Sequence, residues 1–346
     1  MDLFLFHHDR FEALYNCSFK TDEEWFGYGA ENGGVSVMYL LLGGIYIALY
    51  IPILIVMARP KLIKSSCFKI MFCLGIVDVL STLANCIIPG YFGLIGAVGC
   101  NYMNFFYVFG SFGLACWFCQ CALCVTLCLN RLIDFIKPFW MPYLFDGCKT
   151  FIWITLCFGY AMIGFLFCTT PIFSSLGMAY FFDPYFLIPM EDVPVDRSGY
   201  MSAFHSINNI AIVFVLPILH GLIMIGVYLK TYGLSSASLT KIQRKLLLQA
   251  FYICLLNFVS ASIYVYMQFF PCPMFLITVG QMMWQGSNGG VVLIYLTLNR
   301  TIRNGVVELL CSRLNRFRAS MEVHTYMGKS TVAPVNHEMT SYVDRA

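Results

Sequence analysis

Charged residues are scarce in this sequence. Only 11% of the 346 residues are charged and 59% are hydrophobic, whereas an average soluble domain has about 25% charged residues. Such a chain cannot cover its folded surface with polar groups, which excludes an ordinary soluble globular protein. Because the hydrophobic residues fall in long blocks between short polar stretches, we expect a polytopic membrane protein.

Ionisable groups are almost absent from the hydrophobic blocks. Asp78 is the single carboxylate near the middle of any block. The sequence shows neither paired intramembrane charges nor an internal repeat, which are features of transporters and channels. The six histidines lack the spacing of metal ligands, which argues against a membrane-embedded enzyme. We therefore expect no catalytic residue, no metal, no cofactor and no nucleic-acid partner.

Most of the 16 cysteines do not form a disulfide framework in this interpretation, because they lie inside hydrophobic blocks. Five fall within a single block: Cys116, Cys119, Cys121, Cys124 and Cys128. In apolar helical surroundings, small polarizable packing residues are a better interpretation than a zinc site. Four others can reach an oxidising face: Cys17, Cys100, Cys168 and Cys272.

Seven hydrophobic blocks are long enough to cross a bilayer as helices, which takes about 20 residues each. They cover residues 35–57, 67–89, 105–130, 150–173, 206–229, 246–270 and 274–298. Only the sequence Pro271-Cys272-Pro273 separates the last two blocks, and its two prolines favour a tight turn. The sequence therefore predicts an all-α membrane protein with a seven-transmembrane helix bundle at residues 35–298.

The basic residues predict the orientation of this bundle. All but three of the 21 lysines and arginines flank the first, third and fifth connections or follow the last block; the exceptions are Arg10, Lys20 and Arg197. Because loops rich in basic residues stay on the cytoplasmic side, the N-terminus is predicted outside and the C-terminus inside. We expect a multi-pass plasma membrane protein whose first span serves as its targeting segment, since residues 1–34 show no signal-peptide pattern.

Three further segments flank the bundle in this scheme. Residues 1–34 form an extracellular N-terminal segment. Residues 299–318 repeat apolar and basic side chains at helical spacing and predict an amphipathic juxtamembrane helix on the anionic inner leaflet, beside which Cys311 is a palmitoylation candidate. Residues 319–346 are polar and predict a disordered cytoplasmic tail.

Two ionisable residues have two interpretations each. Asp78 is either a hydrogen-bonded structural residue or part of a polar pocket whose state is coupled to helix movement. Arg131, at the inner end of the third span, is either an anchor whose guanidinium reaches the interface or part of a conformational switch. Composition alone leaves both alternatives open.

Seven spans with Asp78 in the second, Arg131 ending the third, Pro217 in the fifth and Tyr295 in the seventh resemble the plan of G-protein-coupled receptors. More specifically, the chain resembles the nematode serpentine chemoreceptors of class T (Srt) from about residue 15 to 310. The segments that carry this resemblance are "YNCS" at 15–18, "YIPIL" at 50–54, "CFKIMFCLGIVD" at 67–78, "LCLNR" at 127–131, "YFFDP" at 180–184 and "IYLTLNRTIR" at 294–303.

The resemblance implies a chemosensory receptor of sensory neurons that binds a small molecule and signals to a heterotrimeric G protein, rather than an enzyme. It places coupling at four residues, Asp78, Asn130, Arg131 and Tyr295. A non-signalling partner subunit of the receptor fold remains an alternative, as does a small-solute transporter. Homo- or hetero-oligomers and the bilayer itself are further partners left open.

The sequence also departs from the broader receptor pattern. Asn130 stands where an acidic residue usually precedes the span-three arginine, so we expect no local ion pair for Arg131 and only a weaker hydrogen bond. The usual Asn-Pro pair before Tyr295 is missing, and glycines at 286, 289 and 290 would supply its flexibility. The external bridge of such receptors points to Cys100, whose partner we rank as Cys168, then Cys17, then Cys272.

The ligand is predicted to be neutral. An amine receptor would carry a carboxylate about five turns outward of Arg131, where this chain has Gly110, Gly113 and Leu114. A pocket in the outer half would then be apolar and aromatic with a few hydrogen-bonding groups. The candidate ligand contacts are Trp117, His205, Asn209, Tyr264, Gln268, Trp284 and Gln285.

Glycan mapping tests the predicted topology. Asn16 and Asn299 both begin Asn-x-Ser/Thr sequons, and they fall on opposite sides of the membrane. In cells that glycosylate secreted domains, Asn16 is expected to carry a glycan and Asn299 none, as read by mass spectrometry and by the Asn16→Gln and Asn299→Gln variants. A glycan at Asn299 would invert the proposed orientation.

Overall fold

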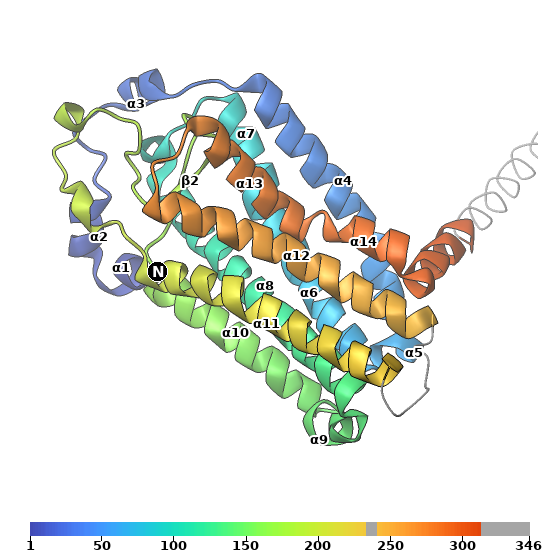
Figure 1. Ribbon diagram of the computed structural model, residues 1–346. Helices are drawn as coiled ribbons and strands as arrows, with labels where there is room; N and C mark the ends of the chain where they lie inside the picture. The colour runs from blue at the N-terminus through green and yellow to red at the C-terminus, as the bar shows by residue number, and fades with distance from the viewer. Residues whose placement is uncertain (233–240, 313–346) are drawn as a thin grey trace, which may run out of the picture. The chain divides into compact units, whose positions relative to one another are not determined.

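A computed structural model describes residues 1–232 and 241–312. Residues 1–303 form one compact unit and residues 304–346 a second, of which the described part, residues 304–312, is helical. In the first unit, long helices run side by side and a small sheet lies near one end of them (Figure 1). The prediction of an all-α membrane protein is confirmed, with this sheet as the one addition among the described residues.

Six helical segments in the described ranges are long and apolar enough to cross a membrane on their own. They are built by α4 (Gly33–Met57), α6 (Ser66–Thr82) with α7 (Ile88–Leu94), α8 (Met103–Ile136), α10 (Lys149–Phe167), α11 (Ala203–Tyr232) and α12 (Lys241–Phe269). The seventh predicted block forms two shorter helices, α13 (Met274–Asn288) and α14 (Val291–Leu298). Helices satisfy their own backbone hydrogen bonds, as a spanning segment in lipid requires.

Two spans are irregular in the middle. A π-helical turn, η1 (Leu83–Ile87), joins α6 to α7, and Gly289 and Gly290 separate α13 from α14. A Cβ atom on Gly289 would lie 1.9 Å from Cδ2 of Tyr46 on α4, so only glycine allows this close approach of the two spans. Two of the three glycines predicted to supply flexibility lie at this break, whereas Gly286 lies within α13.

Short elements connect the spans at both ends. On the side predicted to face the cytoplasm these are α5 (Pro60–Ile63), η3 (Pro138–Trp140) and α9 (Met141–Leu144). At the other end, called the outer end here, lie α1 (Asp2–Phe6), α2 (His8–Leu14), α3 (Asp22–Tyr28), η2 (Gly99–Tyr102), β1 (Ile172–Ser174), β2 (Ala179–Phe181), η4 (Met190–Asp192) and η5 (Arg197–Gly199).

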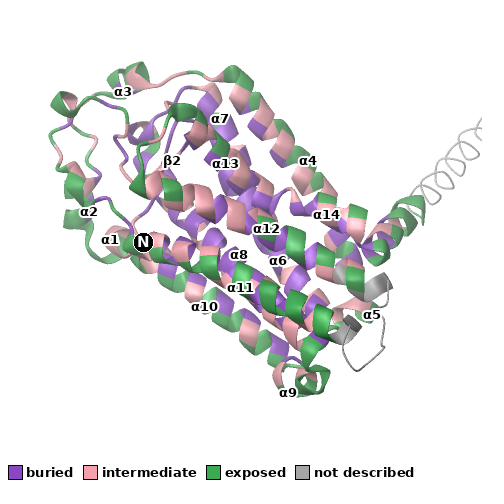
Figure 2. Ribbon diagram, viewed as in Figure 1, coloured by how far each residue is buried: buried purple, intermediate pink, exposed green. Residues whose placement is uncertain are grey.

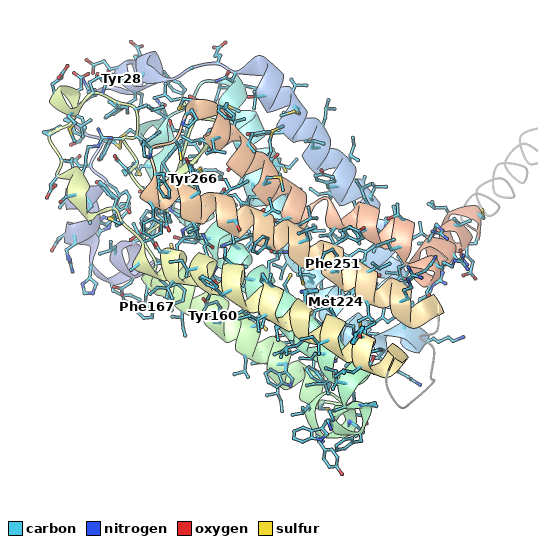
Figure 3. The ribbon with its side chains drawn as sticks, viewed as in Figure 1. Tyr28, Tyr160, Phe167, Met224, Phe251 and Tyr266 are labelled. Carbon is cyan, nitrogen blue, oxygen red and sulfur yellow. A yellow bond between two sulfur atoms is a disulfide. The ribbon has the colours of Figure 1, made fainter. Side chains whose placement is uncertain are left out.

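Helix α8 is the central element of the bundle. It packs against α6, α10, α11 and α12, and Figure 2 shows its residues mostly buried while α10 and α11 expose many. Large apolar side chains such as Phe167, Met224 and Tyr266 lie on the outside of the helices (Figure 3), where lipid would cover them. The polar residues described below therefore lie inside the bundle, where lipid does not reach.

The N-terminal segment is folded over the outer end of the bundle. Phe11 and Tyr15 of this segment pack against Tyr107 of α8, with ring centroids 4.8 and 4.9 Å apart. A disulfide joins Cys17 to Cys100 at the start of span three. Our first-ranked partner for Cys100, Cys168, was therefore wrong. The Sγ atom of Cys168 lies instead 2.8 Å from the hydroxyl of Ser202.

The sheet is an antiparallel hairpin in the loop between α10 and α11. Its register pairs Ile172 with Phe181 and Ser174 with Ala179. Gly110 of α8 lets this loop approach closely, because a Cβ atom there would lie 2.0 Å from the carbonyl oxygen of Pro171. After β2, the guanidinium of Arg197 binds the Asp183 carboxylate at 2.6 Å and holds the rest of the loop.

The structure bears on two predicted modifications without testing them. Asn16 is exposed, whereas the Asn299 side chain is buried and donates to Gln249 Oε1 at 2.9 Å. Cys311 is exposed. The remaining predictions, for residues 313–318 and for the tail at 319–346, lie outside the described residues.

Removal of the disulfide is expected to destabilise the protein. In Cys17→Ser the unfolded chain regains the conformational entropy that the disulfide removes by joining two residues 83 positions apart. Chain-entropy arguments put the resulting loss of folding free energy at up to about 4.5 kcal/mol. Thermal unfolding of the purified protein should show a lower Tm for Cys17→Ser than for Cys168→Ser. Recovery of a Cys100–Cys168 peptide from a non-reducing digest, or equal losses in both variants, would contradict this pairing.

Candidate functional site

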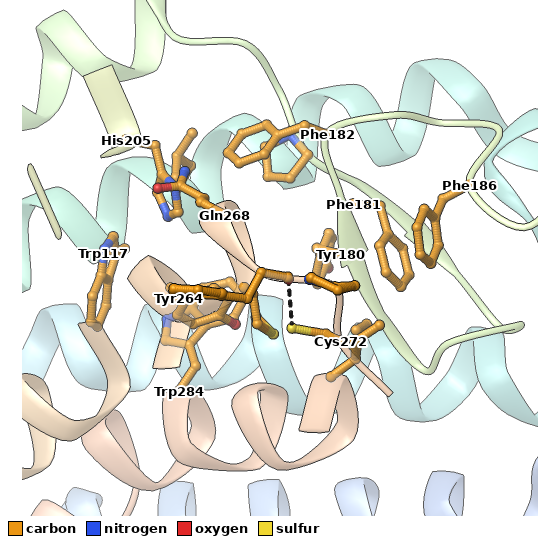
Figure 4. A pocket seen from close by; sticks show the side chains of 17 residues that line it. Trp117, Tyr180, Phe181, Phe182, Phe186, His205, Tyr264, Gln268, Cys272 and Trp284 are labelled. Carbon is orange, nitrogen blue, oxygen red and sulfur yellow. Dashed lines mark hydrogen bonds between the residues drawn. The ribbon is translucent and has the colours of Figure 1, made fainter. Parts of the chain in front are cut away.

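A pocket of about 380 Å³ lies inside the outer half of the bundle (Figure 4). Helices α8, α11, α12 and α13 contribute to it, together with the β2 strand and the segments that follow α12 and β2. It is lined by Leu114, Trp117, Pro171, Ala179, Tyr180, Phe181, Phe182, Phe186, His205, Tyr264, Met267, Gln268, Phe270, Pro271, Cys272, Ile277 and Trp284. Its volume falls within the usual range of small-molecule sites.

Five of the seven predicted ligand contacts line this pocket: Trp117, His205, Tyr264, Gln268 and Trp284. Asn209 and Gln285 do not. The Gln285 side chain instead donates to the carbonyl of Asn85 at 2.8 Å, in the π-helical turn of span two. Helical rotation turns these two amides toward neighbouring helices, so the structure does not place them among the lining residues.

Asn209 lies behind the pocket and orients two of its side chains. Its Oδ1 accepts from Trp117 Nε1 at 2.9 Å and from Asn208 Nδ2 at 3.1 Å. Its Nδ2 must therefore be the donor to His205 Nε2, 3.1 Å away. A neutral imidazole that accepts at Nε2 carries its proton on Nδ1. His205 thus presents an N–H donor at Nδ1.

Three buried polar atoms on the pocket's side chains have no hydrogen-bond partner among the described residues: His205 Nδ1, Gln268 Oε1 and Trp284 Nε1. The Gln268 amide is held by its nitrogen, which donates to the Ser206 hydroxyl at 2.7 Å. Residues that line the pocket thus carry two N–H groups and one carbonyl oxygen that are buried without partners. Buried polar atoms are rarely left unpaired, so these three are suited to bind a polar group of a ligand.

None of the lining residues is acidic, lysine or arginine. Leu114 occupies the wall at the depth where an amine receptor would carry a carboxylate. A charged ligand would be desolvated here without a counter-ion, which is strongly unfavourable. The prediction of an apolar, aromatic pocket is consistent with this lining.

The hairpin supplies pocket residues that sequence reasoning missed. Tyr180, Phe181, Phe182 and Phe186 all line the cavity, and the Tyr180 hydroxyl donates to the Ala84 carbonyl at 2.7 Å. The aromatic run "YFFDP" at 180–184 was visible in the sequence. Its role depends on the hairpin folding inward over the bundle, which no local pattern indicates.

A buried polar cluster lies one turn below the pocket. The Trp284 carbonyl accepts from Ser287 Oγ and Asn288 Nδ2, both at 2.8 Å. Gln120 on α8 donates to the Ser287 carbonyl at 2.7 Å and to Asp78 Oδ1 at 3.2 Å. Hydrogen bonds thus connect the backbone carbonyl of a pocket residue, Trp284, with Asp78 by way of Ser287 and Gln120.

Asp78 is fully buried, and the structure shows no ion pair for it among the described residues. Its Oδ2 lies 2.7 Å from the Tyr50 hydroxyl, which is also 2.9 Å from the Asn288 carbonyl oxygen. A carbonyl only accepts, so if Tyr50 donates to Asn288, the short contact with Asp78 requires a proton on the carboxyl group. This arrangement suits a neutral Asp78 whose hydrogen bonds join α6 to α4 and α8.

Arg131 at the inner end of α8 has partners that differ from the prediction. Asn130 Oδ1 accepts from its Nη2 at 2.6 Å, as expected. In addition, Arg131 Nη1 forms an ion pair with Asp134 Oδ2 at 3.2 Å. The expectation that Arg131 has no local ion pair was wrong, because the acidic residue lies one helical turn after the arginine instead of directly before it.

Two other predicted switch residues lie nearby in the inner half. Asn130 Nδ2 donates to the Ser66 hydroxyl at 2.9 Å and so joins α8 to the start of α6. Tyr295 on α14 is fully buried, and its hydroxyl has no hydrogen-bond partner in the structure. The inner half therefore contains both a held arginine and an unpaired buried hydroxyl.

Comparisons with known proteins agree with this architecture. The family model described as "Serpentine type 7TM GPCR chemoreceptor Srt" matches residues 1–319. Serpentine receptor class T-55 of Caenorhabditis elegans is 25% identical over 332 residues, which cover 94% of this chain and 88% of that protein.

Asn209 is expected to be important for stability even though it does not touch the cavity. In Asn209→Leu the buried Trp117 Nε1 and His205 Nε2 lose their partner, at a cost of about 2–3 kcal/mol. The Tm of the purified protein should fall well below that of Ile207→Ala, a control on the same helix whose side chain is 66% exposed. Equal Tm values in the two variants would refute this role.

Proposed function

The chain belongs to the Srt family of serpentine seven-transmembrane chemoreceptors, and from this premise we propose which ligand it binds and how it signals. We propose that it is a chemosensory receptor that binds a small neutral molecule in the pocket behind the β1–β2 hairpin and signals to a heterotrimeric G protein. The observation that carries this proposal is an aromatic cavity whose lining residues include three buried polar atoms without partners and no charged side chain.

The lining selects a chemical class of ligand. Two N–H donors, on His205 and Trp284, suit a carbonyl, ester or ether oxygen, and the Gln268 carbonyl oxygen suits a hydroxyl. Burying about 200 Å² of apolar ligand surface would contribute about 5 kcal/mol, and each hydrogen bond about 1 kcal/mol. Since association itself costs at least about 4 kcal/mol, about 4 kcal/mol remains, and we expect an affinity of about 1 mM or weaker for a small, oxygenated, mostly hydrocarbon molecule.

The polar cluster below the pocket offers a route from ligand to inner face. A ligand that shifts Trp284 would disturb the hydrogen bonds of Ser287 and Asn288 to its carbonyl. Those residues contact Gln120 and Tyr50, the partners of Asp78. The Gly289–Gly290 break then lets α14 move separately from α13. Ligand shifts this equilibrium only by binding one arrangement more tightly than the other.

At the inner end, we propose that Asn130, Arg131 and Tyr295 take part in coupling. The Arg131 guanidinium is held by Asn130 and Asp134. Because Asp134 is about half exposed, this ion pair contributes at most about 1 kcal/mol. Such a weak restraint can be released by a modest ligand-dependent shift. The arginine is then free to contact a G protein.

One experiment tests ligand binding and coupling separately. Cells that express the receptor would be exposed to a panel of small neutral odorants, with second messengers as the readout and surface expression measured in parallel. Leu114→Trp fills the pocket and should abolish the response. Arg131→Ala should also abolish it, yet the purified variant should still be stabilised by the active odorant, because its pocket is intact.

Ile207→Trp, which adds the same bulk on an exposed part of α11, is the control and should respond like the wild type. An unchanged response in Leu114→Trp would refute the pocket. Full signalling by Arg131→Ala would refute the coupling mechanism and favour a different inner contact. Responses to charged amines alone would refute the neutral ligand class.

A further inference from the structure

Three soft metal-ligand side chains meet in the bundle, away from the pocket. Cys128 of α8, His220 of α11 and Cys254 of α12 place one ligand atom each within 4.8 Å of one another. The two Sγ atoms are 3.2 Å apart, and Cys128 Sγ lies 3.8 Å from both ring nitrogens of His220. Within residues 1–232 and 241–312 this is the one group of three His, Cys, Asp or Glu side chains so placed.

Nothing in the linear sequence indicates this cluster. Its members are separated by 92 and 126 residues from Cys128, and none of the pairs has the short spacing of a zinc motif. Our expectation of no metal rested on that spacing. The cluster arises only because three helices pack together at one depth of the bundle.

The hydrogen bonding of His220 prepares it as a ligand. Its Nδ1 lies 3.0 Å from the carbonyl oxygen of Leu216, one turn earlier on α11. A carbonyl only accepts, so Nδ1 carries the proton and Nε2 has a free lone pair. A histidine that binds metal through one nitrogen usually donates its other N–H to such an acceptor, which fixes tautomer and ring orientation.

Burial and charge favour a metal over three separate polar side chains. Both cysteines are almost completely buried, where two thiolates without a cation would be very unfavourable. Zn²⁺ with two thiolates and a neutral imidazole is electrically neutral, and Cu⁺ is neutral here when one sulfur ligates as a thiolate and the other as a thiol. Soft sulfur ligands select Zn²⁺ and Cu⁺ among common metals.

The separation of the two sulfur atoms requires only a small adjustment. Bonds of about 2.3 Å from a tetrahedral metal to two sulfurs separate those sulfurs by about 3.8 Å. The observed Sγ–Sγ separation of 3.2 Å is therefore about half an ångström short, which side-chain rotation can supply. Three ligands complete the coordination of Cu⁺, whereas Zn²⁺ would need one more, such as a water molecule.

We propose that Cys128, His220 and Cys254 form a binding site for one thiophilic metal ion, Zn²⁺ or Cu⁺, that links α8, α11 and α12. To leave the buried site neutral, Zn²⁺ displaces both thiol protons and Cu⁺ displaces one, and no redox step is involved. The bound ion would fasten three spans to one another. The site is independent of the proposed ligand and of G-protein coupling.

Metal titration of the full-length purified protein tests this site. After reduction and removal of reductant under inert gas, Zn²⁺ and Cu⁺ would each be titrated against a chromophoric chelator, with bound metal measured by mass spectrometry. We expect one ion per chain. Cys128→Ala, Cys254→Ala and His220→Phe should each weaken binding at least about 100-fold. X-ray absorption would distinguish three-coordinate Cu⁺ from four-coordinate Zn²⁺.

Cys116→Ala is the matched control, since it removes another buried thiol from α8 outside the cluster, and it should bind like the wild type. The metal should also raise the Tm of the wild type and of this control, but not of Cys254→Ala. Absence of stoichiometric binding in the reduced protein, or unweakened binding by folded Cys254→Ala, would overturn the proposal. If Cys128 and Cys254 are found joined in a disulfide, and the protein binds no metal after that disulfide is reduced, the proposal is overturned as well.

Discussion

Polar groups inside this bundle must find partners within the protein, because surrounding lipid offers none. Asp78 meets that constraint through Tyr50 and Gln120. Asn209 meets it by bonding at the same time to Trp117 and His205. Since such partners are shared between helices, they also fix how the helices are rotated against one another. The rest of the structure depends on these shared hydrogen bonds.

Because polar groups inside the bundle need partners within the protein, the polar atoms that lack a partner are informative. The polar atoms left without partners include three at the pocket, on His205, Gln268 and Trp284. The Asn209 hydrogen bonds orient His205 so that its free N–H is available there. A neutral, weakly polar ligand would complete this arrangement, whereas a charged one would remain without a counter-ion. We therefore infer the chemical class of the ligand from the unpaired atoms, whereas the cavity limits only the size of the ligand.

The segments at the outer end of the bundle and Arg131 at its inner end are each held by local contacts. The Cys17–Cys100 bridge ties the N-terminal segment to the start of span three, while the second outer loop is held by its own hairpin and by the Arg197–Asp183 ion pair. At the inner end, Asn130 and Asp134 together bind Arg131. An acidic residue one turn later thus supplies the charge that is missing directly before the arginine.

The sequence by itself determined the membrane class, the seven hydrophobic blocks and five of the pocket residues. These features depend on runs of residues along one helix, whose apolar length and local composition can be read directly. The sequence also carried the resemblance to the chemoreceptors, through short segments in a fixed order.

Tertiary structure alone decided the partner of Cys100, the inward fold of the hairpin, the position of Asn209 behind the pocket and the meeting of Cys128, His220 and Cys254. Each of these depends on the rotation and depth at which separate helices pack. The hydrophobic pattern of a membrane span does not specify this rotation, because lipid and protein interior are both apolar. Contacts between residues about 80 or more positions apart, such as Cys17 with Cys100, therefore appear only when the bundle is assembled.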